Sequence, residues 1–315
     1  NYGHGVYVLG GPDAALASAT PVIKNSVVTT RGGAAHGVYA VGSKAEVLSS
    51  DINTSGQGSY GVSAFNNSDA AVKNTSIATS GKKGHGVRAE LRSNVLVENS
   101  DISTIGNEAT GVEVLGSTAS IVNTRITTAG SQSSAVKSGA SAEYKLVEGK
   151  LVTTYIPSLV TMQGGSIETN GGNAFAGYAQ DSVLNMDSTA IKIKGSSYAF
   201  GAHKGSISLI NIRDFDNSAG GALFLTNSSA SFDVASSALT GAVYHRGSDT
   251  SVNTGDMNVS FANDSVWSGY AETYSHDLKT ARVNITIDDS SLWNVTDNSY
   301  TNGALSNAGL INFGE

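Results

Sequence analysis

The sequence predicts an all-β fold, a right-handed parallel β-helix whose coils of about 24–25 residues each contain three short strands. Three observations predict it. A Gly-Val pair recurs at this spacing, two registers of valine and isoleucine follow each copy, and the composition combines 37 glycines with only 3 prolines. A sequence period of this length is typical of solenoids, in which stacked repeats bury one continuous core.

Each coil supplies three apolar positions that recur in step along the chain. The Gly-Val copies are His4–Tyr7, His36–Tyr39, Tyr60–Val62, His85–Val87 and Thr110–Val112. The second register is Ile23, Val47, Val72, Val97 and Ile121, and the third is Val28, Ile52, Ile77, Ile102 and Ile126. Because alternate residues of a strand share one face, we expect these side chains to point into the core.

Three polar columns accompany the apolar ones. They are mostly asparagine (Asn25, Ser49, Asn74, Asn99, Asn123), threonine (Thr30, Thr54, Thr79, Thr104, Thr128) and glycine (Gly32, Gly56, Gly81, Gly106, Gly130). We expect stacked asparagine and threonine side chains to hydrogen-bond from coil to coil. The glycines are expected to supply backbone freedom at a turn.

The period extends over residues 1–315, so we expect one β-helical unit. Three stretches break it and are expected to leave the rod as loops: 10–21, 139–158 and 268–281. Residues 285–315 contain Trp293, Tyr300, Leu305 and Phe313, and we expect them to form stabilising terminal coils with the slowest hydrogen exchange. Asn1 falls within a repeat, so we expect the chain to be part of a longer protein.

Composition excludes several classes of protein. The chain has no cysteine, which excludes disulfides and thiolate metal sites. Its net charge is 19 − 26 = −7, which argues against a nucleic-acid partner, because binding phosphates needs a concentrated basic face. No apolar run approaches the ~18 residues that a membrane-spanning helix requires.

The C-terminal segment carries the most specific motif. Ser291-Leu292-Trp293-Asn294-Val295-Thr296 is followed by Leu305, Asn307 and Gly309 and then by Ile311-Asn312-Phe313. This segment resembles the terminal rungs of pertactin-like bacterial autotransporter passenger domains. The upstream Gly-Val and Ile-x-Thr-x-Gly coils are similar to the repetitive β-helices of the same family.

The resemblance implies a secreted or surface-exposed bacterial virulence factor. It would bind a host-cell surface protein or glycan, as an adhesin or a signalling ligand. The full-length protein would then carry an outer-membrane β-barrel translocator beyond this chain. An integrin-binding Arg-Gly-Asp tripeptide is not present, because Arg246-Gly247 is followed by serine.

Enzymatic and metal-dependent functions have weaker support in the sequence. Neither a Gly-Asp-Ser-Gly nor a Gly-x-Ser-x-Gly nucleophile motif occurs. The acidic pairs Asp214/Asp216 and Asp288/Asp289 leave a carbohydrate-active lyase or glycosidase as an alternative, and a self-associating structural rod is another. The shared column of His4, His36 and His85 is expected to be a stack of surface histidines rather than a metal site. We therefore expect no enzyme activity, metal or cofactor.

Three groups of residues are candidates for partner binding. The first is a group of basic residues within one coil and its turn, and its positive charge suits sulfated glycans or an acidic receptor. It consists of Lys82, Lys83, Arg88 and Arg92. The second and third groups lie in the period breaks and mix aromatic residues with basic ones, as binding hot spots do. They are Tyr144, Lys145, Lys150 and Tyr155, and Tyr270, Tyr274 and His276.

Overall fold

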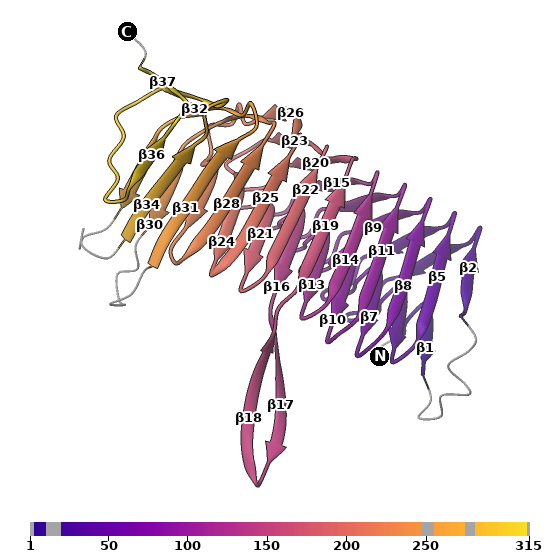
Figure 1. The fold of residues 1–315 in the computed structure, drawn as a ribbon. Helices are drawn as coiled ribbons and strands as arrows, with labels where there is room; N and C mark the ends of the chain where they lie inside the picture. The colour runs from indigo at the N-terminus through magenta and orange to yellow at the C-terminus, as the bar shows by residue number, and fades with distance from the viewer. Residues whose placement is uncertain (1–2, 11–19, 247–254, 275–280, 314–315) are drawn as a thin grey trace.

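The protein is a parallel β-helix (Figure 1). The structure, a computed structural model, describes residues 3–10, 20–246, 255–274 and 281–313. In these ranges all elements are strands, and the strands of successive coils pair in parallel. The predicted fold class is therefore confirmed. No helix long and apolar enough to cross a membrane occurs in the described ranges.

Sheet A contains the strands that follow the recurring glycines. Its strands in spatial order are β1 (Val6–Leu9), β4 (Val38–Val41), β7 (Val62–Phe65), β10 (Val87–Glu90), β13 (Val112–Leu115), β16 (Val136–Gly139), β21 (Phe175–Gln180), β24 (Tyr198–His203), β27 (Phe224–Thr226), β30 (Val243–Arg246) and β33 (Ala271–Tyr274). Neighbours pair without a shift, so that Val62, Val87 and Val112 lie in one line.

Sheet B is the longest of the sheets. It consists of β2 (Val22–Lys24), β5 (Lys44–Leu48), β8 (Asp69–Lys73), β11 (Asn94–Glu98), β14 (Thr118–Val122), β19 (Leu159–Gln163), β22 (Val183–Asp187), β25 (Gly205–Ile210), β28 (Ala230–Ala235), β31 (Gly255–Ala262), β34 (Ala281–Ile287) and β36 (Leu305–Asn307). Val97 pairs with Val72 and Ile121, as the sequence register predicts.

The third side of the rod is divided into two sheets. Sheet C contains β3 (Val27–Thr30), β6 (Asp51–Thr54), β9 (Ser76–Thr79), β12 (Asp101–Thr104), β15 (Arg125–Thr128), β20 (Ser166–Thr169), β23 (Ala190–Ile193) and β26 (Arg213–Asp216). A four-stranded sheet continues it with β29 (Ala238–Thr240), β32 (Val266–Gly269), β35 (Leu292–Val295) and β37 (Leu310–Phe313).

The core is the space that the sheets enclose. Ile77 is 1% exposed and lies between Ile52 and Ile102 of the adjacent coils. Val97, in sheet B, is fully buried. The apolar registers read from the sequence are thus the core columns from the second described coil onward.

The polar columns act differently from the prediction. The asparagine column adopts the left-handed conformation at a corner of each coil, with φ of 46–50° from Asn25 to Asn123, which asparagine tolerates better than most residues. Four of the five threonines bond within their own coil, because their hydroxyls donate to the carbonyl five residues ahead, as Thr79 does to Gly84. Coil-to-coil ladders come instead from other serines, such as Ser68, whose amide donates to Ser93 Oγ at 3.1 Å.

The glycine column serves close packing rather than backbone freedom. A Cβ atom on Gly81 would lie 1.9 Å from the carbonyl oxygen of Gly56 in the preceding coil. None of these glycines has a positive φ, so their backbone conformation is one that other residues can also adopt. Glycine is required because two backbones approach each other directly.

We expect Gly81→Ala to destabilise the protein by about 2 kcal/mol, since the coils must separate locally to admit the methyl group. Gly33→Ala is the matched control, because its Cβ atom would lie 3.8 Å from the nearest atom, the carbonyl oxygen of Gln57. Urea unfolding followed by circular dichroism measures both. Equal midpoints for the two variants would contradict the close-packing role.

The three expected loops have different outcomes. Residues 141–156 form an antiparallel hairpin that projects from the rod (Figure 1). Residues 10–21 and 268–281 fall partly outside the described residues. The prediction of a loop at 268–281 is wrong over residues 268–274. There, β32 pairs with β29 and β33 pairs with β30 inside the sheets.

Of the four large side chains expected to form stabilising terminal coils, only Trp293 is buried. Trp293 is buried and stacks on Trp267 with ring centroids 4.6 Å apart. Tyr300, Leu305 and Phe313, however, are 66%, 52% and 74% exposed, because they lie on the last described strands or beside them, with little to cover them. The dense aromatic packing lies upstream, in Phe200, Phe224, Phe232, Phe261 and Trp267.

Candidate functional site

Within the described ranges, the hairpin is the largest departure from the regular rod. Its strands β17 (Ser141–Val147) and β18 (Lys150–Ile156) pair antiparallel over their full length. Glu148 and Gly149 form the tip, and both have positive φ, 49° and 74°. Two consecutive positive φ values characterise the two-residue turn that matches the twist of paired strands.

The two faces of the hairpin differ in chemistry. The antiparallel pairing, which sets Leu146 opposite Leu151, places both tyrosines and both leucines of the hairpin on one face. Tyr144, Leu146, Leu151 and Tyr155 are 63%, 76%, 65% and 71% exposed. We call these four residues the apolar hairpin face. The opposite face carries Glu143, Lys145 and Lys150, with Val147 and Val152 between them.

The base of the hairpin is held to the rod by an ion pair. Arg92, in the turn before β11, donates two hydrogen bonds of 2.6 Å to the carboxylate of Glu143. Lys145 Nζ lies 3.4 Å from the same carboxylate. Two of the predicted binding groups therefore meet here, since Arg92 belongs to the basic group and Lys145 to the hairpin group.

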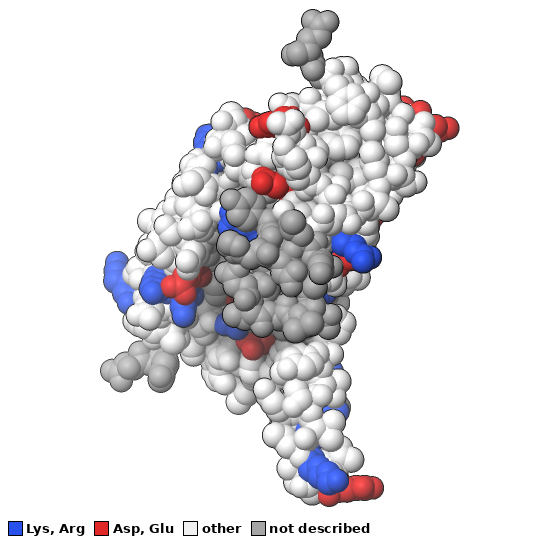
Figure 2. All heavy atoms as spheres, turned by 90° about the vertical axis from the view of Figure 1, so that its left-hand side faces the viewer, with Lys and Arg blue, Asp and Glu red and all other residues white. Residues whose placement is uncertain are grey.

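The rest of the basic group is neutralised by carboxylates. Lys82 and Lys83 both contact Glu108, with N–O distances of 2.9 and 3.3 Å. Arg88 is mostly buried and contacts Glu90 at 3.0 Å. Figure 2 shows one face of the molecule with scattered charges of both signs, including basic and acidic atoms side by side near the end of the hairpin. The described members of the basic group therefore form ion pairs rather than a free basic patch.

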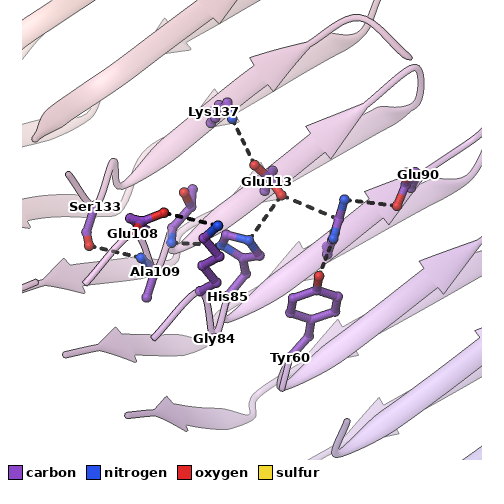
Figure 3. Close-up of polar contacts among 12 residues, drawn as sticks. Tyr60, Gly84, His85, Glu90, Glu108, Ala109, Glu113, Ser133 and Lys137 are labelled. Atoms are coloured by element: carbon purple, nitrogen blue, oxygen red, sulfur yellow. Dashed lines mark hydrogen bonds and ion pairs between the residues drawn. The ribbon is translucent and has the colours of Figure 1, made fainter. Parts of the chain in front are cut away.

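A buried charge cluster lies on the outer face of sheet A (Figure 3). Arg88, Glu113 and Lys137 occupy paired positions on β10, β13 and β16, one coil apart. Glu113 is 5% exposed and contacts Lys137 at 3.0 Å, His85 at 3.2 Å and Arg88 Nε at 3.4 Å. Burial alone would raise the pKa of Glu113, but its interactions with His85, Lys137 and Arg88 hold the pKa below its ordinary value.

His36 and His85 are buried neutral groups rather than the surface histidines expected. Both are 8% exposed. The Nδ1 atom of each accepts a hydrogen bond from a backbone amide of the next coil. The amide of Tyr60 donates to His36 at 3.0 Å, and the amide of Thr110 donates to His85 at 2.9 Å. This bond places the proton of each neutral ring on Nε2. Burial, with smaller effects from nearby charges, lowers the pKa of each to about 4.

Acid should therefore destabilise the fold. A histidine whose pKa is about 4 when folded and ~6.5 when unfolded contributes stability that is complete above pH 6.5 and is lost as the pH falls toward 4. We expect wild type to lose about 2 kcal/mol more than His36→Gln between pH 7 and pH 4.5. Urea unfolding at the two pH values measures this difference. The same acid dependence in both proteins would show that His36 is not the titrating group.

The third predicted group lies near the other end of the rod. Tyr270 hydrogen-bonds Tyr244 through its hydroxyl and packs edge-on against it. Tyr274 is the last residue of β33, and His276 lies outside the described residues. β33 is five strands from β16 in sheet A, about 24 Å at the usual spacing, so this group does not join the hairpin.

In each of the two acidic pairs, one carboxylate accepts hydrogen bonds from backbone amides of a turn. Asp216 accepts a hydrogen bond from the backbone amide of Ser218 at 3.0 Å. Asp288 accepts bonds from the amides of Asn263 at 2.7 Å and Ser290 at 3.2 Å. In the described ranges no group of three or more histidine or acidic residues is placed to hold a metal ion.

Sequence reasoning missed the centre of the charge cluster. Glu113 and Lys137 were not among the candidates, although Glu113 directly follows the Gly111-Val112 copy of the repeat. The residue after each Gly-Val pair points outward, and reading that column across coils would have aligned Arg88 with Glu113.

A scan against protein-family models finds no match, and a search of curated proteins finds no similar sequence.

Proposed function

We propose that the chain is a surface-exposed or secreted bacterial binding protein that contacts a receptor protein on host cells through its hairpin. The apolar hairpin face is the observation that carries the proposal. It presents two tyrosines and two leucines, each more than half exposed, at a distance from the rod (Figure 1). Tyrosine is enriched in binding hot spots, where it supplies a large contact area at low entropic cost.

The energetics of the hairpin support this role. An isolated two-stranded hairpin is at most marginally stable in water, and this one gains no packing on its apolar face from the described part of the rod. The Arg92–Glu143 pair fixes only its base. A partner that covers the apolar hairpin face would bury it and stabilise both strands. The resemblance to autotransporter passengers, whose loops contact host cells, points to the same role.

Replacing residues 142–155 with a short Gly-Ser turn tests the proposal. We expect the circular dichroism spectrum and melting transition to be retained, because β14 and β19 pair directly without the hairpin. Binding to host cells should fall at least tenfold, or about 1.4 kcal/mol. Unchanged binding would contradict the proposal.

Point variants separate the two faces of the hairpin. Tyr144→Ser with Tyr155→Ser removes the aromatic rings of the apolar hairpin face and should reproduce most of the loss. Val147→Ser with Val152→Ser removes exposed apolar side chains from the opposite face, and we expect less than a threefold effect, under about 0.7 kcal/mol. Sedimentation of wild type serves to detect self-association. Dimers that disappear with the tyrosines would favour a self-associating rod over a receptor-binding one.

A further inference from the structure

The outer face of sheet A carries a line of stacked rings, which we call the ring column. It starts with His4, His36, Tyr60 and His85, whose successive ring centroids are 5.0, 4.4 and 5.1 Å apart. It resumes farther along the rod with Phe175 and Tyr198, at 5.3 Å. Stacked aromatic pairs stabilise by about 0.5–1.5 kcal/mol beyond the area they bury, so a continuous column would be the more stable arrangement.

The ring column is interrupted at two coils by small side chains. Backbone hydrogen bonds from Gly86 to Thr110, from Gly111 to Ser134 and from Ala135 to Phe175 show that Thr110 and Ser134 occupy the missing positions. A hollow of about 410 Å³ lies here, and His85, Thr110, Ser134 and Phe175 all line it. This volume lies within the roughly 300–1,000 Å³ range of small-molecule sites.

The hollow combines charged groups with aromatic ones. Glu113 and Lys137 line it from the adjacent column, and Tyr178 is the next residue of that same column. The Tyr178 ring lies 5.2 Å from that of Phe175. A Cβ atom on Gly201 would lie 2.5 Å from the Phe175 ring and 2.9 Å from the Tyr178 ring, so glycine in the next coil makes room for both.

The charges around the hollow balance one another. Lys83 pairs with Glu108 and Lys137 pairs with Glu113, and the neutral His85 also contacts Glu113. A charged ligand would have to disrupt one of these pairs. A neutral ligand that both donates and accepts hydrogen bonds would instead add to them, since carboxylate oxygens accept and the lysine ammonium donates.

The geometry points to a binding site for a neutral saccharide in this hollow. The apolar C–H face of one sugar ring packs on Phe175 and Tyr178, and its hydroxyl groups bond Glu113 and Lys137. The site is independent of the hairpin, because the hollow is lined by the rod alone. The hollow is shallow, so we expect dissociation constants of about 0.1–10 mM for single oligosaccharides.

Titration of the full chain with neutral oligosaccharides tests the site. The probes are oligomers of glucose, galactose, mannose and N-acetylglucosamine, and a sulfated heparin hexasaccharide is the acidic comparison. Binding is followed by the NMR signals of the Phe175 and Tyr178 rings. We expect at least one neutral oligomer to shift both signals and heparin to bind more weakly. The absence of any shift at about 10 mM, or tighter binding of heparin, would overturn the proposal.

Ser134→Tyr is the decisive variant, because it fills the hollow without changing charge and places at 134 a residue that the ring column already has at 60 and 198. We expect at least a tenfold loss of saccharide affinity with an unchanged circular dichroism spectrum. Lys137→Met leaves Glu113 paired with Arg88 and His85 and should also weaken binding, so it tests the site even if Ser134→Tyr fails to fold. Retained affinity in a folded Ser134→Tyr protein, or in Lys137→Met, would exclude this site. The protein without its hairpin should bind as wild type does, so failure here and failure of the receptor proposal are distinguishable.

Discussion

Replacing Ile77 with aspartate is expected to destabilise the protein by about 4–5 kcal/mol, the largest effect of any single substitution proposed for this chain. Ile77 is 1% exposed and lies between Ile52 and Ile102. Its Cγ2 atom would be 2.3 Å from a Cβ placed on Gly61, so this methyl group packs directly on the glycine backbone. An aspartate in this position has no room to turn toward water.

The control for this substitution is Lys73→Asp on the preceding strand. Lys73 faces outward and pairs with Glu98 at 3.1 Å. Exposed ion pairs contribute about 0–1 kcal/mol, so the expected loss is under about 1 kcal/mol even with the new carboxylate beside Glu98. Urea unfolding at pH 7 compares the two variants with wild type. An Ile77→Asp midpoint equal to that of wild type would show that the column does not form the core.

The core columns were predictable because their residue type repeats. Ile52, Ile77 and Ile102 are identical at a constant spacing, and a buried position in a stacked coil accepts little else. The corner residues repeat as well. Residue type alone, however, does not show whether an asparagine is there to hydrogen-bond the next coil or to adopt a positive φ, as Asn74 does. The sequence therefore located the asparagine column and misassigned its role.

Outward columns carry no such repetition, and this is where prediction failed. Arg88, Glu113, Lys137 and Tyr178 occupy one column with four different residue types. Their chemistry depends on which neighbours the register brings together. Arg88, Glu113 and Lys137 follow the repeat spacing, but placing Tyr178 beside them requires the exact pairing across the insertion at 141–156. The hairpin itself was visible only as a break in the period, because exposed strands leave no buried alternation for a pattern to reveal.

Replacing Glu113 with glutamine is the second large effect that we expect, about 3–5 kcal/mol of lost stability. The substitution keeps the shape of the side chain and removes the negative charge that Lys137 and Arg88 share. Two positive groups would then remain on the outer face of sheet A without their common partner. Glu98→Gln is the matched control, because Glu98 forms a similar cross-strand pair with Lys73 in a more exposed place, worth under about 1 kcal/mol.

A double-mutant cycle distinguishes loss of the charge from loss of packing. Lys137→Gln alone should cost only about 1 kcal/mol, since Glu113 keeps Arg88 and His85 as partners. If the cost of Glu113→Gln comes from uncompensated positive charge, adding Lys137→Gln to it should recover part of the loss, because the double variant has one buried charge fewer. Additive costs in urea unfolding would mean that Glu113 acts through packing alone, and that the cluster is not coupled electrostatically.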